Sequence, residues 1–376
     1  MYTFLAFIAI FGGVVFIHEL GHFLAARSVG VRVDKFYVGM DLFGLGYVLH
    51  KGQETEYGVG LFPFGGYCKI AGMVDESLDP TVKGSDDEFN SKNTFEKLWI
   101  LSAGVIMNFI LAIVLFFAVF TIYGESTLAP IAYNITQDGP ADNAGIESGS
   151  LITKINEQNI NSWSDISNSL LNIKENEEIS IEYKFSEEIY ANKLLSNQYK
   201  TVNLIPKRQM FIQEKDTTYR FLIGIERVPD NIIELNPEQY IVFNKINLLE
   251  GFKMSIIAPL NIIIMQMMGL SQLISGNVGL DSLGGPIKIT QMAGQAAQFG
   301  LSYFLQFMAM ISTILGFMNI LPIPGLDGGH ALIAIIEGLA RREIPFKIKM
   351  IIQQIAIFLI LGLTVFVLGN DIKNLF

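Results

Sequence analysis

The run of residues 98–123 is 26 residues long and contains no charged side chain. A helix needs about 20 apolar residues to cross the hydrocarbon core of a bilayer, so this run predicts a transmembrane helix. Three more apolar segments of comparable length occur at residues 2–26, 301–324 and about 348–368. The chain is 51% hydrophobic and only 16% charged, a composition typical of membrane proteins. We therefore predict a polytopic α-helical membrane protein with four transmembrane helices.

The first apolar segment has a second interpretation, as a cleavable signal peptide. It lacks a basic region ahead of the apolar run, and the run leads into His18 and Glu19 without a small-residue cleavage site. Both features favour a retained transmembrane helix over a signal peptide.

Positive charges lie at one end of each predicted span, and they predict the orientation of the chain. The Lys and Arg residues concerned are Arg27, Arg32, Lys35, Lys92, Lys97, Arg341, Arg342, Lys347 and Lys349. No Lys or Arg precedes the first span, and none lies between Tyr123 and Lys154. Because cytoplasmic loops are enriched in Lys and Arg, we expect both termini and residues 125–300 to lie outside the cytoplasm.

The overall charge and the cysteine content exclude some classes of partner and bond. The net charge of −10 argues against nucleic acid, which selects basic surfaces. A single cysteine, Cys68, excludes a disulfide within the chain. No base is positioned next to Cys68 by the sequence, so we expect a small buried apolar residue there and not a nucleophile.

Residues 126–228 have the pattern of a soluble domain inserted between the second and third spans. Alternating patterns such as EISIEYKF and KTVNLIPK predict β-strands. The stretch GPADNAGIESGSLITKINEQNINSWSDISNSLL resembles the core of a PDZ domain, with a Pro-Ala turn, a strand and a short helix in the usual order. Ser150 stands where many such domains have Asp, and no clear GLGF-type carboxylate-binding loop is visible. A plain structural β domain is the alternative.

The segment VVFIHELGHFLAAR places His18, Glu19 and His22 inside the first apolar run. An HExxH pattern on a helix puts both imidazoles on one face, where they can bind a single metal ion. Glu19 lies close enough to take a proton from water without being a ligand. Zinc suits such a site, with one coordination position left open, so we predict one Zn²⁺ per chain. The alternative, a pair of core histidines, leaves Glu19 buried in a membrane helix at a cost of about 3 kcal/mol.

A catalytic zinc needs a third protein ligand, and Asp327 is the strongest candidate. It lies in NILPIPGLDGGHAL, where prolines and glycines break the third span at its cytoplasmic end. His330 is an alternative ligand, although we expect it to support the site from outside the metal's own ligands. His50 lies among polar loop residues and is expected to be solvated.

A ligand at Asp327 also constrains the topology of residues 252–274, which are apolar enough to suggest a fifth span. A crossing there would reverse the third span and place Asp327 at the membrane face opposite His18 and His22. Pro259 also disfavours a continuous span. We therefore expect residues 238–275 to form an amphipathic helix or a bent pair of helices on the outer membrane surface.

These motifs together resemble the site-2 protease family of intramembrane zinc metalloproteases (peptidase family M50B), and within it the bacterial proteases that regulate sigma-E. HELGH in the first span and NILPIPGLDGGH near the third carry the resemblance. FPFGGYCKIAGM is similar to the family's membrane re-entrant β-loop, AGVIMNF to the Gly-xxx-Asn element of the second span, and LGGPIKITQMAG to the segment after the PDZ region. The bacterial regulators typically carry two PDZ domains in tandem, whereas residues 126–228 leave room for one.

The resemblance implies roles for the site residues: zinc binding for His18, His22 and Asp327, activation of water for Glu19, contact with the scissile peptide for Asn108 and Asn319, and substrate binding for Gly65 and Gly66. An interhelical hydrogen bond is an equal alternative for Asn108. Gly104 is expected to let helices approach closely. The glycine pair suggests a hairpin whose edge strand pairs with an unwound substrate, with an ordinary cytoplasmic hairpin as the alternative.

The expected organisation follows from these assignments. It comprises transmembrane helix 1 with HExxH (1–27), a cytoplasmic-side re-entrant β-loop region with a membrane-associated β-hairpin (28–96), transmembrane helix 2 (97–124), a periplasmic PDZ-like α+β domain (126–228), a membrane-surface helical region (238–299), transmembrane helix 3 with the LDGG motif and a cytoplasmic loop (300–345), and transmembrane helix 4 (346–370).

The resemblance implies an endopeptidase that cuts single-span membrane proteins, such as anti-sigma factors or remnant signal peptides, after another protease has shortened them on the outer side. It also implies a place in the bacterial inner membrane, with the lipid bilayer as a partner and the active site near the cytoplasmic side. Two alternatives stay open: a transporter or channel that uses the His, Glu and Asp residues as a proton or metal path, and a PDZ-bearing membrane scaffold. A Glu19→Gln variant separates the scaffold from the peptidase, since only scaffold function would survive it.

Overall fold

The chain forms two compact units in the computed structural model, which describes residues 2–40, 46–60, 62–73, 84–171, 173–184, 199–213, 216–235, 237–279 and 284–373. One unit contains residues 1–120 and 248–376, and the other contains residues 121–247. The second unit extends beyond the predicted insertion of residues 126–228 at both ends.

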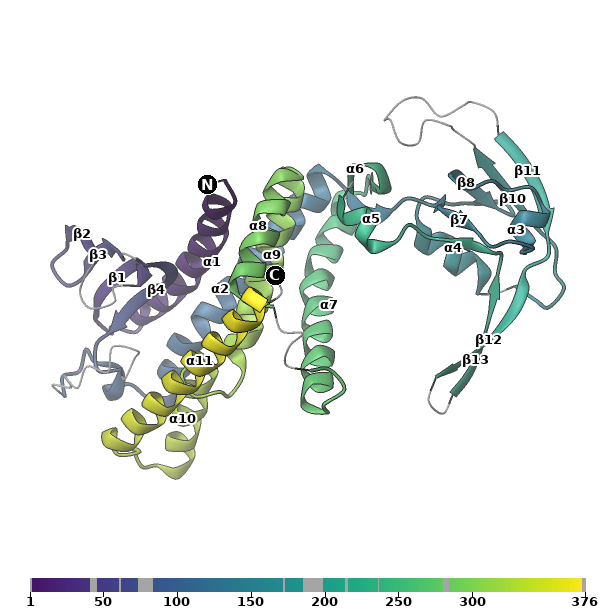
Figure 1. Ribbon diagram of the computed structural model, residues 1–376. Helices are drawn as coiled ribbons and strands as arrows, with labels where there is room; N and C mark the ends of the chain where they lie inside the picture. The colour runs from purple at the N-terminus through teal and green to yellow at the C-terminus, as the bar shows by residue number, and fades with distance from the viewer. Residues whose placement is uncertain are drawn as a thin grey trace. The chain divides into compact units, whose positions relative to one another are not determined.

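Long apolar helices make up most of the first unit (Figure 1). Its helices are α1 (Tyr2–Ser28), α2 (Thr94–Ile122), α7 (Leu248–Ile274), α8 (Pro286–Gln298), α9 (Leu301–Ile320), α10 (Asp327–Ala340) and α11 (Phe346–Lys373), with a 3-10 turn at Phe89–Ser91. Five of them, α1, α2, α7, α9 and α11, are long and apolar enough to cross a membrane by length and composition. Each of the four predicted spans coincides with one of these helices, and the chain is a multi-pass membrane protein.

The helix α7 is the one that the sequence placed on the membrane surface. It runs without interruption through Pro259, so a single helix forms and not a bent pair. It packs against α9, and most of its large apolar side chains are exposed. An apolar surface of this kind requires lipid or protein to cover it. The structure thus adds α7 as a fifth candidate span, and the four-span count stays a prediction.

A four-stranded sheet lies between α1 and α2, where the sequence predicted a hairpin. Its strands are β1 (Val33–Met40), β2 (Tyr47–Lys51), β3 (Glu56–Val59) and β4 (Phe62–Ile70), in the order β2-β3-β1-β4. β1 is parallel to β3 and antiparallel to β4, with Val38 opposite Gly66 and Phe36 opposite Cys68. Among the described strands β4 pairs only with β1, so it is an edge strand, and it packs along α1 (Figure 1).

The break between α9 and α10 turns the chain sharply. α9 ends at Ile320 and α10 begins at Asp327, and Gly325 between them has a φ of +90°, which favours glycine. A Cβ at Gly328 would collide with the carbonyl group of Ile320. The start of α10 therefore folds directly against the end of α9, and Asp327 is held at this junction.

The second unit is an α+β domain, as predicted. Its strands are β5 (Glu125–Leu128), β6 (Ile131–Ala132), β7 (Asn134–Ile135), β8 (Ser150–Ile155), β9 (Gln158–Asn159), β10 (Ile179–Lys184), β11 (Tyr199–Leu204), β12 (Lys207–Gln213), β13 (Asp216–Leu222), β14 (Ile225–Glu226) and β15 (Ile241–Asn244), and its helices are α3 (Pro140–Asn143), α4 (Trp163–Leu170), α5 (Asp230–Leu235) and α6 (Pro237–Tyr240). The main sheet has the order β11-β10-β8-β6. The predicted strands in LITKIN, EISIEYKF and KTVNLIPK form β8, β10 and β11, and the short helix is α4, which begins with a capping box of Ser162 and Asp165. Its identity as a PDZ domain stays a prediction.

A buried carboxylate fixes the start of α8 from the far end of α11. Asp371 is 6% exposed. Its Oδ1 accepts a hydrogen bond from the backbone N–H of Gly285 at 2.8 Å, and its Oδ2 accepts one from Ile287 at 2.9 Å. These donors belong to the first turn of the helix, where no intrahelical acceptor is available and negative charge is favoured. Asp371 therefore caps α8 from another helix.

Replacing this cap should destabilise the first unit. We expect Asp371→Ala to lower the free energy of unfolding by about 1–3 kcal/mol, since buried backbone donors lose a charged acceptor. Urea unfolding in detergent, followed by tryptophan fluorescence, would measure the change. Glu343 is exposed, so Glu343→Ala is the matched control, with an expected change within about 0.5 kcal/mol. Equal effects of the two substitutions would contradict the capping role.

Candidate metal centre

The helix α1 carries the HELGH motif and brings its two histidines together. His18 and His22 are one turn apart and each is 7% exposed. Their Nε2 atoms lie 3.2 Å from each other. The i and i+4 spacing thus brings the two Nε2 atoms close together on one face of the helix, as the sequence predicts.

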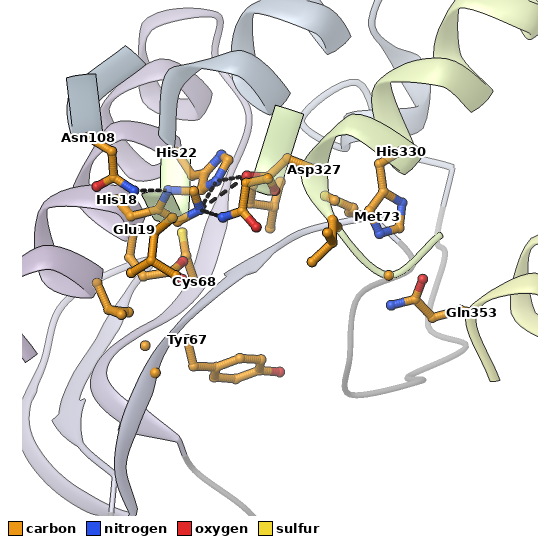
Figure 2. Close-up of a pocket in the computed structure, with 18 residues that line it drawn as sticks. His18, Glu19, His22, Tyr67, Cys68, Met73, Asn108, Asp327, His330 and Gln353 are labelled. Carbon is orange, nitrogen blue, oxygen red and sulfur yellow. Dashed lines mark hydrogen bonds and ion pairs between the residues drawn. The ribbon is translucent and has the colours of Figure 1, made fainter. Parts of the chain in front are cut away.

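Asp327 completes the cluster from the first turn of α10. Its Oδ2 lies 3.1 Å from Nε2 of His18 and 3.3 Å from Nε2 of His22. Two ligand atoms that each lie about 2.1 Å from a tetrahedral zinc are separated by about 3.4 Å. The three atoms are therefore spaced as zinc requires. Among the described residues, these three form the cluster of His, Cys, Asp and Glu side chains able to hold a metal ion (Figure 2).

Hydrogen bonds from other helices orient the two imidazoles. His22 Nδ1 lies 2.8 Å from the carbonyl oxygen of Ile100 in α2, so Nδ1 carries the proton and Nε2 is left for the metal. His18 Nδ1 lies 3.2 Å from the side-chain amide of Asn108, which is 1% exposed. An imidazole bound to metal through Nε2 donates from Nδ1, and the Asn108 amide accepts this hydrogen bond when its carbonyl oxygen faces the ring. Asn319 Nδ2, from α9, lies 3.2 Å from Nε2 of His18.

Gly104 makes room for the histidines. A Cβ at this position would collide with Nε2 of His22 and lie 2.7 Å from Cε1 of His18. The sequence suggested a helix-packing role for Gly104, and in the structure this glycine of α2 faces the imidazole rings of α1. The two helices also approach closely at Gly21, where a Cβ would collide with the backbone of Ala103.

Glu19 lies between the metal cluster and the strand β4. Its carboxylate accepts a hydrogen bond from the backbone N–H of Cys68. A Cβ at Gly66 would collide with the Glu19 side chain. The edge strand thus holds the Glu19 carboxylate at the same cavity as His18, His22 and Asp327.

A cavity of about 320 Å³ connects all of these groups (Figure 2). All eight predicted site residues line it: His18, Glu19, His22, Gly65, Gly66, Asn108, Asn319 and Asp327. Its volume falls within the range of pockets that bind small ligands or short peptide segments. The sequence prediction therefore selected residues from five separate elements that meet at one cavity.

The structure also describes three other residues that were considered from the sequence. His330 lines the cavity but is not part of the metal-ligand cluster of the described residues, in line with a supporting role. His50 is exposed on β2, as expected, and its ring lies 6.2 Å from that of Tyr57. Cys68 is partly buried and packs against apolar residues near the N-terminal half of α2.

The sequence missed Met73 and Gln353, which also line the cavity. Gln353 was detectable in principle as a polar residue within an apolar helix. The adjacent Gln354 has the same property and is exposed, so the sequence alone did not distinguish the two.

Comparisons with known proteins identify the family of this chain. Residues 6–363 match peptidase family M50. A Rickettsia conorii protein that is named as a zinc metalloprotease is 30% identical over 381 aligned residues, which cover the whole of both chains. A Clostridium acetobutylicum protein with the same kind of name is 32% identical over 363 residues, or 96% of this chain and 95% of the relative. The regulator of sigma E protease of Haemophilus influenzae is 28% identical over 445 aligned positions that cover 98% of each.

The family match spans both metal-binding motifs, from the HELGH helix to the loop that carries Asp327 and on into α11. A match of this extent covers well over half of the chain. The chain therefore belongs to peptidase family M50 and is a zinc metalloendopeptidase.

Proposed function

We propose that this protease acts within the membrane, as a site-2 protease that hydrolyses a peptide bond inside the transmembrane segment of a single-span protein. The observation that carries the proposal is the position of the metal ligands. His18 and His22 lie inside an apolar helix that is long enough to span a bilayer, and Asp327 follows directly after a second such helix. A substrate must enter the membrane region to reach them.

His18, His22 and Asp327 are the proposed zinc ligands, and Glu19 the proposed general base. Zinc, when bound, acts as a Lewis acid that makes water more acidic and polarises a carbonyl group. The Glu19 carboxylate takes the proton of the attacking water and returns it to the leaving amine. The backbone of β4 holds this carboxylate in place. Asn108 orients His18 through Nδ1. The Asn319 amide lies beside the proposed zinc-binding nitrogen of His18 and lines the cavity, which supports a proposed contact with the oxygen of the scissile carbonyl.

The edge strand β4 is the proposed docking site for the substrate backbone. A transmembrane helix uses its own peptide groups in internal hydrogen bonds and must unwind before it can be cut. Gly65 and Gly66 lie on β4 and line the cavity. Addition of the unwound segment to this edge would replace the lost hydrogen bonds where water is scarce.

The proposed substrates are single-span proteins, such as anti-sigma factors and remnant signal peptides, that another protease has already cut on the outer side. One relative is named as a regulator of sigma E protease, which supports this class. The distribution of Lys and Arg favours a bacterial inner-membrane orientation with the termini and residues 126–228 in the periplasm. There the inserted domain would exclude intact substrates by size.

Removing the general base or a ligand should have different consequences. In detergent-purified protein with a single-span test substrate, we expect Glu19→Gln to keep about one zinc per chain and to lose about 10²–10⁴-fold in cleavage rate. Asp327→Asn should lose both zinc and cleavage. Metal analysis and cleavage assays on the same preparations would measure these outcomes.

The matched control for this experiment is His50→Ala, which removes an exposed histidine. It should retain both zinc and activity. If wild-type protein binds no zinc, or if Glu19→Gln cleaves as fast as wild type, the proposed site is wrong.

Gly104→Ala tests the fit of the metal site. Alanine is a better helix former than glycine, so the substitution would favour α2 itself. Its Cβ would nevertheless displace the two imidazoles, and we expect zinc affinity to fall at least about 10-fold. Competition with a zinc chelator would measure it. Gly362 has open space around it, so the control Gly362→Ala should leave zinc affinity unchanged. An unchanged zinc affinity in Gly104→Ala would contradict the contact between Gly104 and the imidazoles.

Gly66→Ala tests the placement of Glu19. The added methyl group would push the carboxylate away from its position while leaving the metal ligands untouched. We expect normal zinc content and a loss of about 100-fold in kcat, because a displacement of about 1 Å in a catalytic group has an effect of this size. Full activity of the variant would show that Glu19 does not depend on this contact.

A further inference from the structure

A glutamine of α11 lies at the wall of the catalytic cavity, and its amide nitrogen has no partner among the residues that the structure describes. Gln353 is 3% exposed and lines the same cavity as the metal ligands. No hydrogen-bond acceptor among the described residues pairs with its buried Nε2. Figure 2 shows the side chain directed toward the region of Met73 and His330. Burying an unpaired amide in an apolar helix is unfavourable, so a role in binding is the simplest reason for a glutamine here.

The backbone of α11 is fixed on both sides of Gln353. One turn before it, Lys349 Nζ lies 2.6 Å from Oε1 of Glu337 in α10. One turn after it, Ala356 packs against Gly325, where an added Cβ would lie 3.1 Å from the Ala356 Cβ. Gln353 is therefore held next to the loop that leads into Asp327 and does not depend on a mobile segment for its position.

An extended peptide on β4 needs partners on its second edge. In a strand the N–H and C=O groups point alternately to the two sides, so pairing with β4 satisfies only half of them. The remainder face away from β4, inside a cavity with little water. The wall contributed by α11 offers the primary amide of Gln353, which both donates and accepts hydrogen bonds.

We propose that Gln353 is a substrate-binding residue whose side-chain amide hydrogen-bonds the backbone of the unwound substrate segment on the edge not paired with β4. This inference rests on the proposed function. The ligand is a peptide group and not a particular side chain, so Gln353 contributes affinity for extended backbone of any sequence. The proposed role is in binding and not in hydrolysis, since Gln353 is not part of the cluster that can hold the metal.

Substrate binding by full-length protein in detergent tests the proposal. Binding of a fluorescent single-span peptide would be measured in a Glu19→Gln background, in which turnover is slowed by about 10²–10⁴-fold. It would be compared with and without Gln353→Met, a substitution of similar shape that removes the amide. We expect binding about 5- to 10-fold weaker, the effect of losing one hydrogen bond, with unchanged zinc content. Gln354→Met, on the exposed face of the same helix, is the matched control and should bind normally.

Turnover kinetics then separate binding from other roles. In the wild-type background, Gln353→Met should raise KM by a similar factor and leave kcat within about twofold, and Gln353→Asn should restore part of the loss. A fall in kcat with unchanged KM and binding would assign Gln353 to water supply and overturn the proposal, as would normal binding and turnover. Failure of wild-type protein to cleave any single-span substrate would instead overturn the proposed function.

Discussion

The meeting of three ligand atoms within 3.3 Å, inside an apolar set of helices, is the constraint on which the rest of this structure depends. Two of the atoms come from α1 and the third from the start of α10, some 300 residues later in the chain. Polar groups at this depth are tolerated only when they are paired or bind metal. Neighbouring elements supply part of that requirement: α2 provides the Ile100 carbonyl for His22 and the Asn108 amide for His18, and β4 provides a backbone donor for Glu19.

Three glycines, which have no side chain, are as important to the site as the side chains around them. At Gly104 the absent Cβ leaves space for the imidazoles, at Gly66 for Glu19, and at Gly328 for the turn that delivers Asp327. Each glycine faces a different part of the site: the imidazoles, the Glu19 side chain and the backbone at the end of α9. Since packed interiors cannot absorb even one methyl group without displacement, the metal site is positioned by sterics as much as by hydrogen bonds. This explains how helices from distant parts of the chain place ligand atoms with the spacing that zinc needs.

The parts of the site that were predictable from sequence are those encoded by local spacing. His18 and His22 are one helical turn apart, and the prolines and glycines around Asp327 mark a break whatever the tertiary structure is. The sequence predicted a hairpin, and the structure has a four-stranded sheet. The parallel pairing of β1 with β3 was not predicted, because the residue pattern of a strand does not specify which other strand it pairs with. The apolar composition of α7 favours a membrane-spanning helix, whereas Pro259 disfavours a continuous one. In the structure the helix continues through the proline. Gln353 and Gln354 are equivalent in the sequence, and only the rotation of α11 about its axis directs the first of them into the cavity.

An intramembrane site of this kind recognises a conformation before it recognises a sequence. The groups at the cavity that can face a substrate are a backbone edge on β4, two glycines, and amides from α9 and α11. In the proposed function these groups pair with peptide groups, which a helix keeps satisfied internally and exposes only when it unwinds. The free energy needed to unwind a transmembrane segment then decides which substrates are cut. The contacts of the cavity with the substrate backbone offset this free energy, and they are the same for every sequence. Helix-destabilising residues near the cut site, and not specific side chains, are what such a cavity would select.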